Sequence, residues 1–567
     1  MNKKDNKNIP VSTHIFMFPF KWDIKKSEFS NSELDTNIVE IDRKLKKNNW
    51  EVNEFKIEDD FDYGSYIYFY PFVRNAILNG VKKEKDKKNC IVNNYEYKFE
   101  EGYYNIKLKQ KKEEYKLKIN SIKLKIFNTG VGILSFETEN YSKIDFCTKA
   151  FEDILNINDF GRRIYPQFYP MDCVKNSFLA DELSITLNDK NGYPRKIKED
   201  FTDVLHTMSD STYGNCSNPR QYTYISKTIM QILGNDDFTY YKEDKQDDRI
   251  LITPIIDDRM FIINFINNKY ISSLLTKNID NNKKWAKLLF VDNDDLTIQD
   301  EDMVQDLIKK HTYRRWLNYG TVYGITRYSF LGVAGDAYYE TNILRNHFKT
   351  MYYEMTALVL ALRASIISFS NEAASISAFE IDKENNGSDQ ILISKIDNLY
   401  KRYIEFVNRL YFREVTAQEQ GIEIYEMLIN SMNIERDIKD LNNEIEKLYN
   451  YATLKAERNT NKKINIITLV GALIAIPSFF TGFFGMNIFA NPNDLIKWFT
   501  NKTGLIWTYM YIIFPICIIS IFLRQYTPII SIGKLYNLIK DTIKHMDNKE
   551  RIIVILLITL LIVLYKF

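Results

Sequence analysis

The sequence predicts an α+β domain followed by a long helical stalk and a C-terminal hairpin of two transmembrane helices. Three observations support this fold class. Apolar residues alternate with lysines in the first third of the chain. Later, apolar residues recur at intervals of three and four positions, and two long uncharged runs lie near the end. The expected parts are residues 1–335 for the α+β domain, 336–463 for long helices and stalk, 464–523 for the hairpin and 524–567 for a C-terminal extension.

Composition excludes several classes of protein. The 567 residues carry a formal net charge of +2, with acidic residues interspersed among the lysines, so we expect no direct binding of nucleic acid. The five cysteines show no C-x-x-C spacing, which argues against a zinc site and a disulfide framework. The chain has no paired histidines and no Gly-rich phosphate loop, so we expect neither an enzyme nor a bound cofactor.

The N-terminal elements begin with an aromatic-rich apolar run. Thr13 to Asp23 (THIFMFPFKWD) predicts a buried strand, and the charged segment Asp42 to Lys56 predicts a surface helix. Tyr66 to Leu78 follows, in which Pro71 marks the point where a strand gives way to a helix.

A two-residue period then predicts antiparallel strands with one solvated face, because lysines occupy many alternate positions. The apolar positions of this period are Tyr104, Ile106, Leu108, Tyr115, Leu117, Ile119, Ile122, Leu124 and Ile126. Asn128-Thr129-Gly130 predicts a turn and Val131 to Glu137 another strand, after which Tyr141 to Asn156 has helical spacing.

The segment Ile157 to Gln167 (INDFGRRIYPQ) contains two adjacent arginines, Arg162 and Arg163. Guanidinium groups beside a glycine and aromatic residues suit a phosphate and a stacked base. The alternative is a surface turn in which both arginines pair with Asp153 or Asp159.

The second half of the domain mixes strands and helices. Its predicted elements are a loop over Leu187–Pro219, a helix over Tyr222–Leu233, a hairpin of strands Arg249–Ile256 and Met260–Phe265 turning at Asp257-Asp258, and a short strand over Leu288–Val291. The cluster Asp292-Asn293-Asp294-Asp295 after this strand suits either a divalent metal ion or the cap of the next helix.

Glu340 to Phe369 predicts a long helix of the first domain, because Arg363 interrupts it and the uncharged part is too short to cross a bilayer. From Ile391 onward the spacing predicts a coiled-coil-like stalk, which Gly421 is expected to loosen midway. The residues of its apolar seam are Ile396, Leu399, Tyr403, Phe406, Leu410, Ile434, Ile438, Leu441, Ile445, Leu448 and Ala452.

The first uncharged run, Ile464 to Phe484, covers 21 residues, or about 30 Å of helix. A second run, Leu505 to Leu523, follows after a short loop, so the two form a hairpin in the membrane. Arg551 to Phe567 is shorter and suits either a thin third membrane helix or a segment lying along the bilayer. The basic residues crowded before the first run place the large domain in the cytosol; they are Lys455, Arg458, Lys462 and Lys463.

The turn after the first run begins with Gly485-Met486-Asn487. This tripeptide follows a long charged helix and a first span and precedes a second span, and in this context the chain resembles the CorA family of divalent-cation channels. The resemblance implies a homopentamer in the cytoplasmic membrane. Gly485, Met486 and Asn487 would then form the selective mouth of a pore for Mg²⁺ or a similar ion, and the simpler alternative is a membrane anchor that conducts nothing.

The first span would line this pore with one helical face. The predicted lining and gate residues are Asn461, Ile464, Ile467, Gly471, Ala475 and Ser478. Rings of isoleucine form gates by excluding water. The alternative for each position is ordinary packing against lipid or the second span.

Four cytosolic segments resemble a long branch of CorA-like proteins associated with type III CRISPR systems, namely His14–Asp23, Tyr68–Leu78, Asn128–Glu137 and Ile157–Phe168. That resemblance implies gating by a nucleotide second messenger, adenylated S-adenosylmethionine (SAM-AMP). It makes Arg162 and Arg163 phosphate contacts, with Arg74 as a further ligand-binding residue. The alternative is a housekeeping transporter of Mg²⁺ or another divalent metal, gated by cytosolic Mg²⁺.

Overall fold

The computed structural model describes residues 9–24, 38–78, 90–108, 111–141, 147–164, 179–188, 194–200, 225–240, 247–256, 259–381, 388–484, 501 and 503. The chain divides into two compact units, Met1–Glu457 and Arg458–Phe567.

The strands are β1 (Ser12–Asp23), β2 (Trp50–Val52), β3 (Val92–Tyr97), β4 (Glu101–Leu108), β5 (Glu113–Phe127), β6 (Val131–Asn140), β7 (Glu182–Asn188), β8 (Pro194–Asp200), β9 (Phe238–Thr239), β10 (Ile250–Pro254), β11 (Phe261–Asn267), β12 (Thr312–Tyr313), β13 (Val322–Ile325) and β14 (Ser329–Ala334). The helices are α1 (Ile38–Lys47), α2 (Asp60–Tyr68), α3 (Pro71–Ile77), α5 (Cys147–Gly161), α8 (Lys227–Leu233), α9 (Lys269–Thr276), η1 (Ile279–Asn281), α10 (Lys283–Phe290), α11 (Glu301–His311), η2 (Leu317–Tyr319), the π-helical η3 (Glu340–Leu344), α12 (Arg345–Lys349), α13 (Met351–Ile381), α14 (Ser388–Arg409), α15 (Glu419–Ser431) and α16 (Ile434–Phe484).

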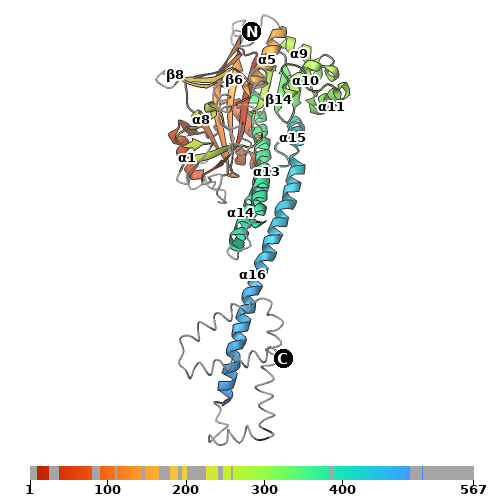
Figure 1. The fold of residues 1–567 in the computed structure, drawn as a ribbon. Helices are drawn as coiled ribbons and strands as arrows, with labels where there is room; N and C mark the ends of the chain where they lie inside the picture. Colours follow the sequence, from red (N-terminus) through yellow and green to blue (C-terminus); the bar gives the residue numbers. More distant parts are fainter. Residues whose placement is uncertain are drawn as a thin grey trace, which may run out of the picture. The chain divides into compact units, whose positions relative to one another are not determined.

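In the described part of the chain, fourteen strands form one mixed sheet with the main order β12-β13-β14-β11-β1-β6-β5-β4-β7-β8. Its pairs are antiparallel except for β11 with β14 and β9 with β10. Helices α9, α10 and α11 gather on one side near β14 (Figure 1). A mixed α and β domain followed by long helices is therefore confirmed, while the two-span hairpin lies largely outside the described residues.

Strand β1 lies at the centre of the sheet and is buried on both faces. Ile15 and Met17 face the core that contains α13, whereas Phe16, Phe18 and Trp22 face the opposite core. This explains why the first apolar run has no polar alternation, because a central strand covered on both sides needs apolar residues at consecutive positions.

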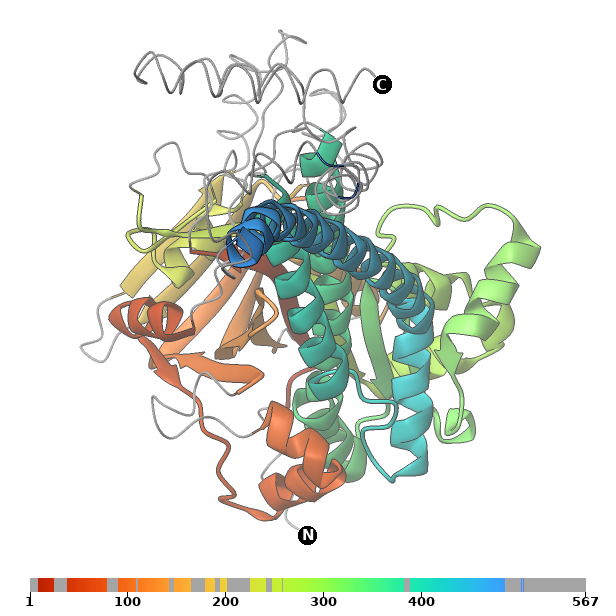
Figure 2. The ribbon, with the colours of Figure 1, turned by 90° about the horizontal axis from the view of Figure 1, so that it is seen from below.

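Helix α13 confirms the buried helix expected from Glu340 onward. The segment Glu340–Ala378 is the one described helix that is long and apolar enough to cross a membrane, yet 67% of its most apolar window is buried in the protein. It contacts β1 and β6 (Figure 2), so this length of apolar helix serves as core of the domain.

The predicted alternating strands are confirmed as β4 and β5, and the strand predicted over Val131–Glu137 is confirmed as β6. The turn between β5 and β6 contains Gly130 at φ 83°. The predicted hairpin at Asp257-Asp258 is wrong. Strands β10 and β11 both form, but each pairs with a different half of β1 instead of with the other. Part of the expected loop, Pro194–Asp200, is strand β8, paired with β7.

Several segments adopt a different secondary structure from the one expected, because capping residues begin or end a helix where the composition suggested a strand. Tyr66 to Tyr68 belongs to helix α2, where the Asp59 side chain accepts a hydrogen bond from the Asp62 backbone N–H, while α3 begins at Pro71 as predicted. Leu288 to Phe290 ends helix α10, which stops at Val291 in the left-handed region.

The predicted helix over Asp42–Lys56 instead ends at Lys47, before Asn49 at φ 63° and strand β2. The left-handed backbone at Asn49 ends the helix, because a residue in that region cannot continue a right-handed helix.

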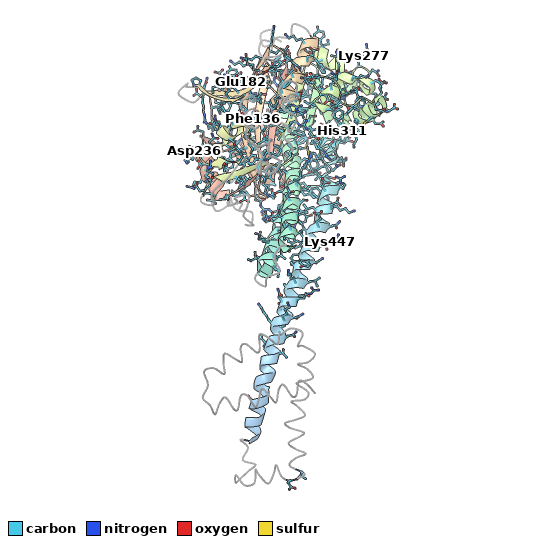
Figure 3. The ribbon with its side chains drawn as sticks, in the orientation of Figure 1. Phe136, Glu182, Asp236, Lys277, His311 and Lys447 are labelled. Atoms are coloured by element: carbon cyan, nitrogen blue, oxygen red, sulfur yellow. The ribbon has the colours of Figure 1, made fainter. Side chains whose placement is uncertain are left out.

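The stalk consists of three helices, α14, α15 and α16, instead of one coiled-coil strand. Its predicted seam is buried except at Leu448, which is half-buried. The Tyr400 and Tyr449 rings stack with centroids 4.1 Å apart where α14 meets α16. Lys447 lies on the exposed face of α16 (Figure 3).

Gly421 does not loosen the stalk. It lies buried in α15, where its missing side chain admits the Tyr68 hydroxyl group of α2.

We predict that Gly421→Ala lowers the free energy of unfolding by about 1–3 kcal/mol, the usual effect of forcing atoms into a filled site. A Cβ there would lie 2.3 Å from the Tyr68 hydroxyl oxygen and 2.5 Å from Thr416 Cγ2. Gly64→Ala in α2 is the matched control, since a Cβ at Gly64 meets nothing within 4 Å and alanine favours helix by about 1 kcal/mol. Thermal melting of the full chain in detergent should move in opposite directions for the two variants.

Candidate functional site

The predicted pore mouth, Gly485, Met486 and Asn487, lies outside the described residues, as do the second uncharged run and Arg551–Phe567. The first run is described as helix to its end, because α16 continues to Phe484. The helical prediction for this run is therefore confirmed, and the mouth remains a prediction from the sequence.

The predicted lining positions follow steps of three or four residues, which place them along one face of α16. All of them are exposed in the single chain, namely Asn461, Ile464, Ile467, Gly471, Ala475 and Ser478. Ile464 is 52% exposed and Ile467 is 70% exposed, and a Cβ built on Gly471 would meet no atom within 4 Å. Ile464 and Ile467 are the large apolar side chains among these six positions, and both face away from the rest of the single chain.

Basic side chains precede this face, as the orientation argument requires. Arg458, Lys462 and Lys463 are exposed, and the Lys455 ammonium group lies 5.6 Å from the centre of the Tyr451 ring. These groups are available to the water or lipid headgroups that border an apolar span.

Arg162 and Arg163 follow the end of α5 and are buried, with exposed fractions of 2% and 7%. Asp159 Oδ1 lies 2.9 Å from Arg163 Nη2 and 3.7 Å from Arg162 Nη2. Pairing with Asp159 is thus confirmed, and the expected surface location is wrong. Asp153, the other expected partner of the two arginines, instead accepts a hydrogen bond from the Tyr115 hydroxyl group.

Arg74 belongs to helix α3 and has different neighbours. Its guanidinium carbon lies 4.2 Å from the centre of the Tyr66 ring, a cation–π contact, and its Nη1 lies 3.5 Å from the Tyr66 carbonyl oxygen. The three arginines predicted to bind a ligand therefore come from two places in the fold, helix α3 and the segment after α5, and have separate partners.

Helix α5, which positions Arg162 and Arg163, is tied to β1 by a buried polar network. His14 Nδ1 lies 2.8 Å from Asn158 Oδ1, and His14 Nε2 lies 2.8 Å from Ser12 Oγ. Asn158 Nδ2 in turn donates to Asn264 Oδ1 on β11. Burial lowers the pKa of His14 to about 4, so the imidazole is neutral at pH 7 and joins α5 to the sheet without a charge.

The aspartate cluster after α10 holds its own loop. Asp292 Oδ2 accepts hydrogen bonds from the backbone and hydroxyl groups of Thr297, and helix α11 is capped by Asp300 instead. Neither expected role applies, since no group of three or more acidic, histidine or cysteine side chains among the described residues is arranged to hold a metal ion.

Comparison with known proteins bears on the C-terminal part. Residues 374–524 match the family model of the CorA-like Mg²⁺ transporter protein. The match includes α14, α15, α16, both uncharged runs and Gly485-Met486-Asn487, and it confirms the resemblance over this segment. Comparisons with curated proteins and with solved structures gave no match.

We predict that the His14 network makes the domain less stable as the pH falls. The unfolded chain binds a proton at His14 with a pKa near 6.5, whereas the folded chain binds it only near pH 4. The contribution of His14 is therefore complete above pH 6.5 and is lost between pH 6.5 and 4, to a total of about 3 kcal/mol.

Chemical denaturation of wild type and His14→Gln across this range should show the smaller pH dependence in the variant. Burial also lowers the pKa values of His311 and His347. Both proteins contain these two histidines, so subtracting the unfolding free energy of the variant from that of wild type cancels their contribution. Equal pH dependence in both proteins would contradict the assignment.

Proposed function

We propose that the chain is one subunit of a membrane channel for divalent cations, with Mg²⁺ as the expected ion. The observation that carries this proposal is the family match over residues 374–524, which contains both uncharged runs and Gly485-Met486-Asn487. Because one hairpin cannot enclose a water-filled path, several copies must surround an axis, and we infer a homopentamer.

The pore would select its ion at the Asn487 ring. Mg²⁺ holds its water tightly, so a ring of neutral amide oxygens hydrogen-bonds the hydrated ion without stripping it. Gly485 permits the tight turn and Met486 packs beside it. Below this ring, the exposed face of α16 would carry small residues at Gly471, Ala475 and Ser478. Ile464 and Ile467 would form an apolar gate.

The proposed location is the cytoplasmic membrane, with residues 1–335 and the stalk of residues 336–463 in the cytosol and the hairpin of residues 464–523 crossing the bilayer. The basic residues before the first run support this orientation, because the loop after it carries only Lys497 and Lys502 against Asp494. Residues 524–567 would insert their apolar part as a third membrane segment.

We further propose that a cytosolic ligand opens the channel. The specific ligand that we propose is the nucleotide second messenger SAM-AMP, acting in type III CRISPR antiviral defence. Arg162, Arg163 and Arg74 would contact it. Since Arg162 and Arg163 are buried, binding there requires that α5 and the chain after it open. The second candidate, a housekeeping transporter closed by cytosolic Mg²⁺, is favoured by the description of the matched family.

We predict that Asn487→Ala reduces Mg²⁺ flux into liposomes at least tenfold or removes selectivity for Mg²⁺ over Na⁺, because the amide ring is lost. Asn493→Ala, in the same outer loop, is the control and should leave flux unchanged. Wild-type flux and selectivity in Asn487→Ala would exclude the proposed mouth.

We also predict that SAM-AMP inside the liposomes raises flux at constant Mg²⁺. Arg162→Gln and Arg163→Gln should weaken the response, with circular dichroism as the check on folding. Flux that responds only to internal Mg²⁺ would reject the second messenger and leave the housekeeping transporter.

A further inference from the structure

A cavity of about 200 Å³ lies in the first unit, between α2, strands β3 and β5, and the junction of α12 with α13. No motif in the sequence marks it. Its charged lining residues are Asp62, Lys123, Lys125, Lys349 and Glu354, and Phe55, Asn94 and Tyr353 lie beside them. Three ammonium groups at one small cavity are unusual, because buried lysines need compensating partners.

Two of the lysines are fixed by carboxylates. Lys125 Nζ lies 2.9 Å from both Glu354 Oε2 and Asn94 Oδ1. Lys349 Nζ lies 2.7 Å from Glu137 Oε1 behind the cavity. Burial alone would raise the pKa of Glu137, but the charges of Lys349 and Lys123 outweigh it and hold the pKa below its ordinary value.

Lys123 is bound less firmly than the other two. Its nearest carboxylate oxygen, Glu137 Oε2, lies 3.7 Å away, which is beyond a hydrogen bond, and its side chain is 29% exposed. Among the described residues it makes no side-chain hydrogen bond, so its three N–H donors remain available beside the cavity.

An aromatic wall accompanies these charges. The Tyr353 ring has Lys123 Nζ 5.3 Å and Lys125 Nζ 5.6 Å from its centre, and its hydroxyl group donates to Ser135 Oγ. Phe55 lines the same cavity and stacks against Tyr66. The cavity thus combines donors for a compact anion with faces for a planar ring.

We propose that this cavity binds the phosphoryl end of a small phosphate ester, with Lys123 as the main contact and Tyr353 and Phe55 beside the ester group. Its volume is below the range of about 300–1,000 Å³ typical of pockets for larger ligands. It therefore holds a phosphoryl group with part of its substituent.

The cavity also lies beside residues that are hydrogen-bonded to the segment joining α14 to α15. Helix α2 presents Asp62, Ser65 and Phe69 to the cavity. Next to it, the Tyr68 carbonyl oxygen accepts a hydrogen bond from Thr416 Oγ1, and the Tyr70 N–H donates to the Val415 carbonyl oxygen 3.0 Å away. A ligand that shifts α2 shifts the segment joining α14 to α15. This regulatory part rests on the proposed channel function, whereas the binding site does not.

The test is calorimetric titration of the full chain in nanodiscs with AMP and with inorganic phosphate. We expect both to bind and to compete, and Lys123→Gln to raise the Kd for AMP at least tenfold. Lys123→Arg should keep binding within about threefold, which separates loss of charge from loss of fold. Lys118→Gln, at an exposed position of the same strand, is the matched control and should bind as wild type.

Hydrogen exchange measured with AMP should slow in residues 53–69 and in residues 412–421. Absence of AMP binding at millimolar concentration, or equal affinity in Lys123→Gln, would overturn the site. Protection of residues 53–69 without residues 412–421 would overturn the link to the stalk. Mg²⁺ flux into liposomes that hold protein from the same preparation separates the two proposals, when it is measured with internal SAM-AMP, with internal AMP and with neither. Flux in any of these conditions without AMP binding rejects the site alone, and AMP binding without flux in any of them rejects the channel alone.

Discussion

The packing of α13 on the sheet is the constraint on which the rest of the first unit depends. Its apolar residues bury the odd positions of β1, and its Glu354 pairs with Lys125 of β5. Lys349, the last residue of the preceding helix α12, pairs with Glu137 of β6. The helices α14, α15 and the first part of α16 then add to the same core. The pairs Lys349–Glu137 and Glu354–Lys125 join the end of α12 and the start of α13 to two neighbouring strands, which positions α13 on the sheet.

Much of this arrangement follows from local pattern. Alternation of apolar and polar residues predicted β4 and β5, and the apolar seam predicted which face of the stalk helices is buried. Pairing between distant strands does not follow, because the partner of β10 and β11 is β1, more than 200 residues earlier in the chain. Helix α10 was missed because its apolar residues resemble a strand, while Asn282, whose side chain caps the Trp285 N–H, lies outside the apolar run.

The candidate sites divide in the same way. The alignment of Ile464 to Ser478 along one helical face could be predicted from the sequence, because residues three or four positions apart lie on the same face of an α-helix. The lysines of β5 were interpreted as a solvated face, but α13 covers that face at Lys125, which is 5% exposed. Burial by an element more than 200 residues away leaves no local signal. Arg162 and Arg163 were expected at the surface because their backbone contacts with Met260 and Arg259 come from a segment almost 100 residues later.

Strand β8 ends the main order of the described strands, and its sequence PRKIKED begins with proline and carries charges at five of seven positions. Proline and lysine at an outer strand discourage further strands from adding to it. An assembly that holds several identical sheets close together raises their local concentration far above that of free subunits. In the oligomer proposed above, this charged border would keep neighbouring sheets from pairing into one continuous sheet, so the copies would remain separate folded bodies.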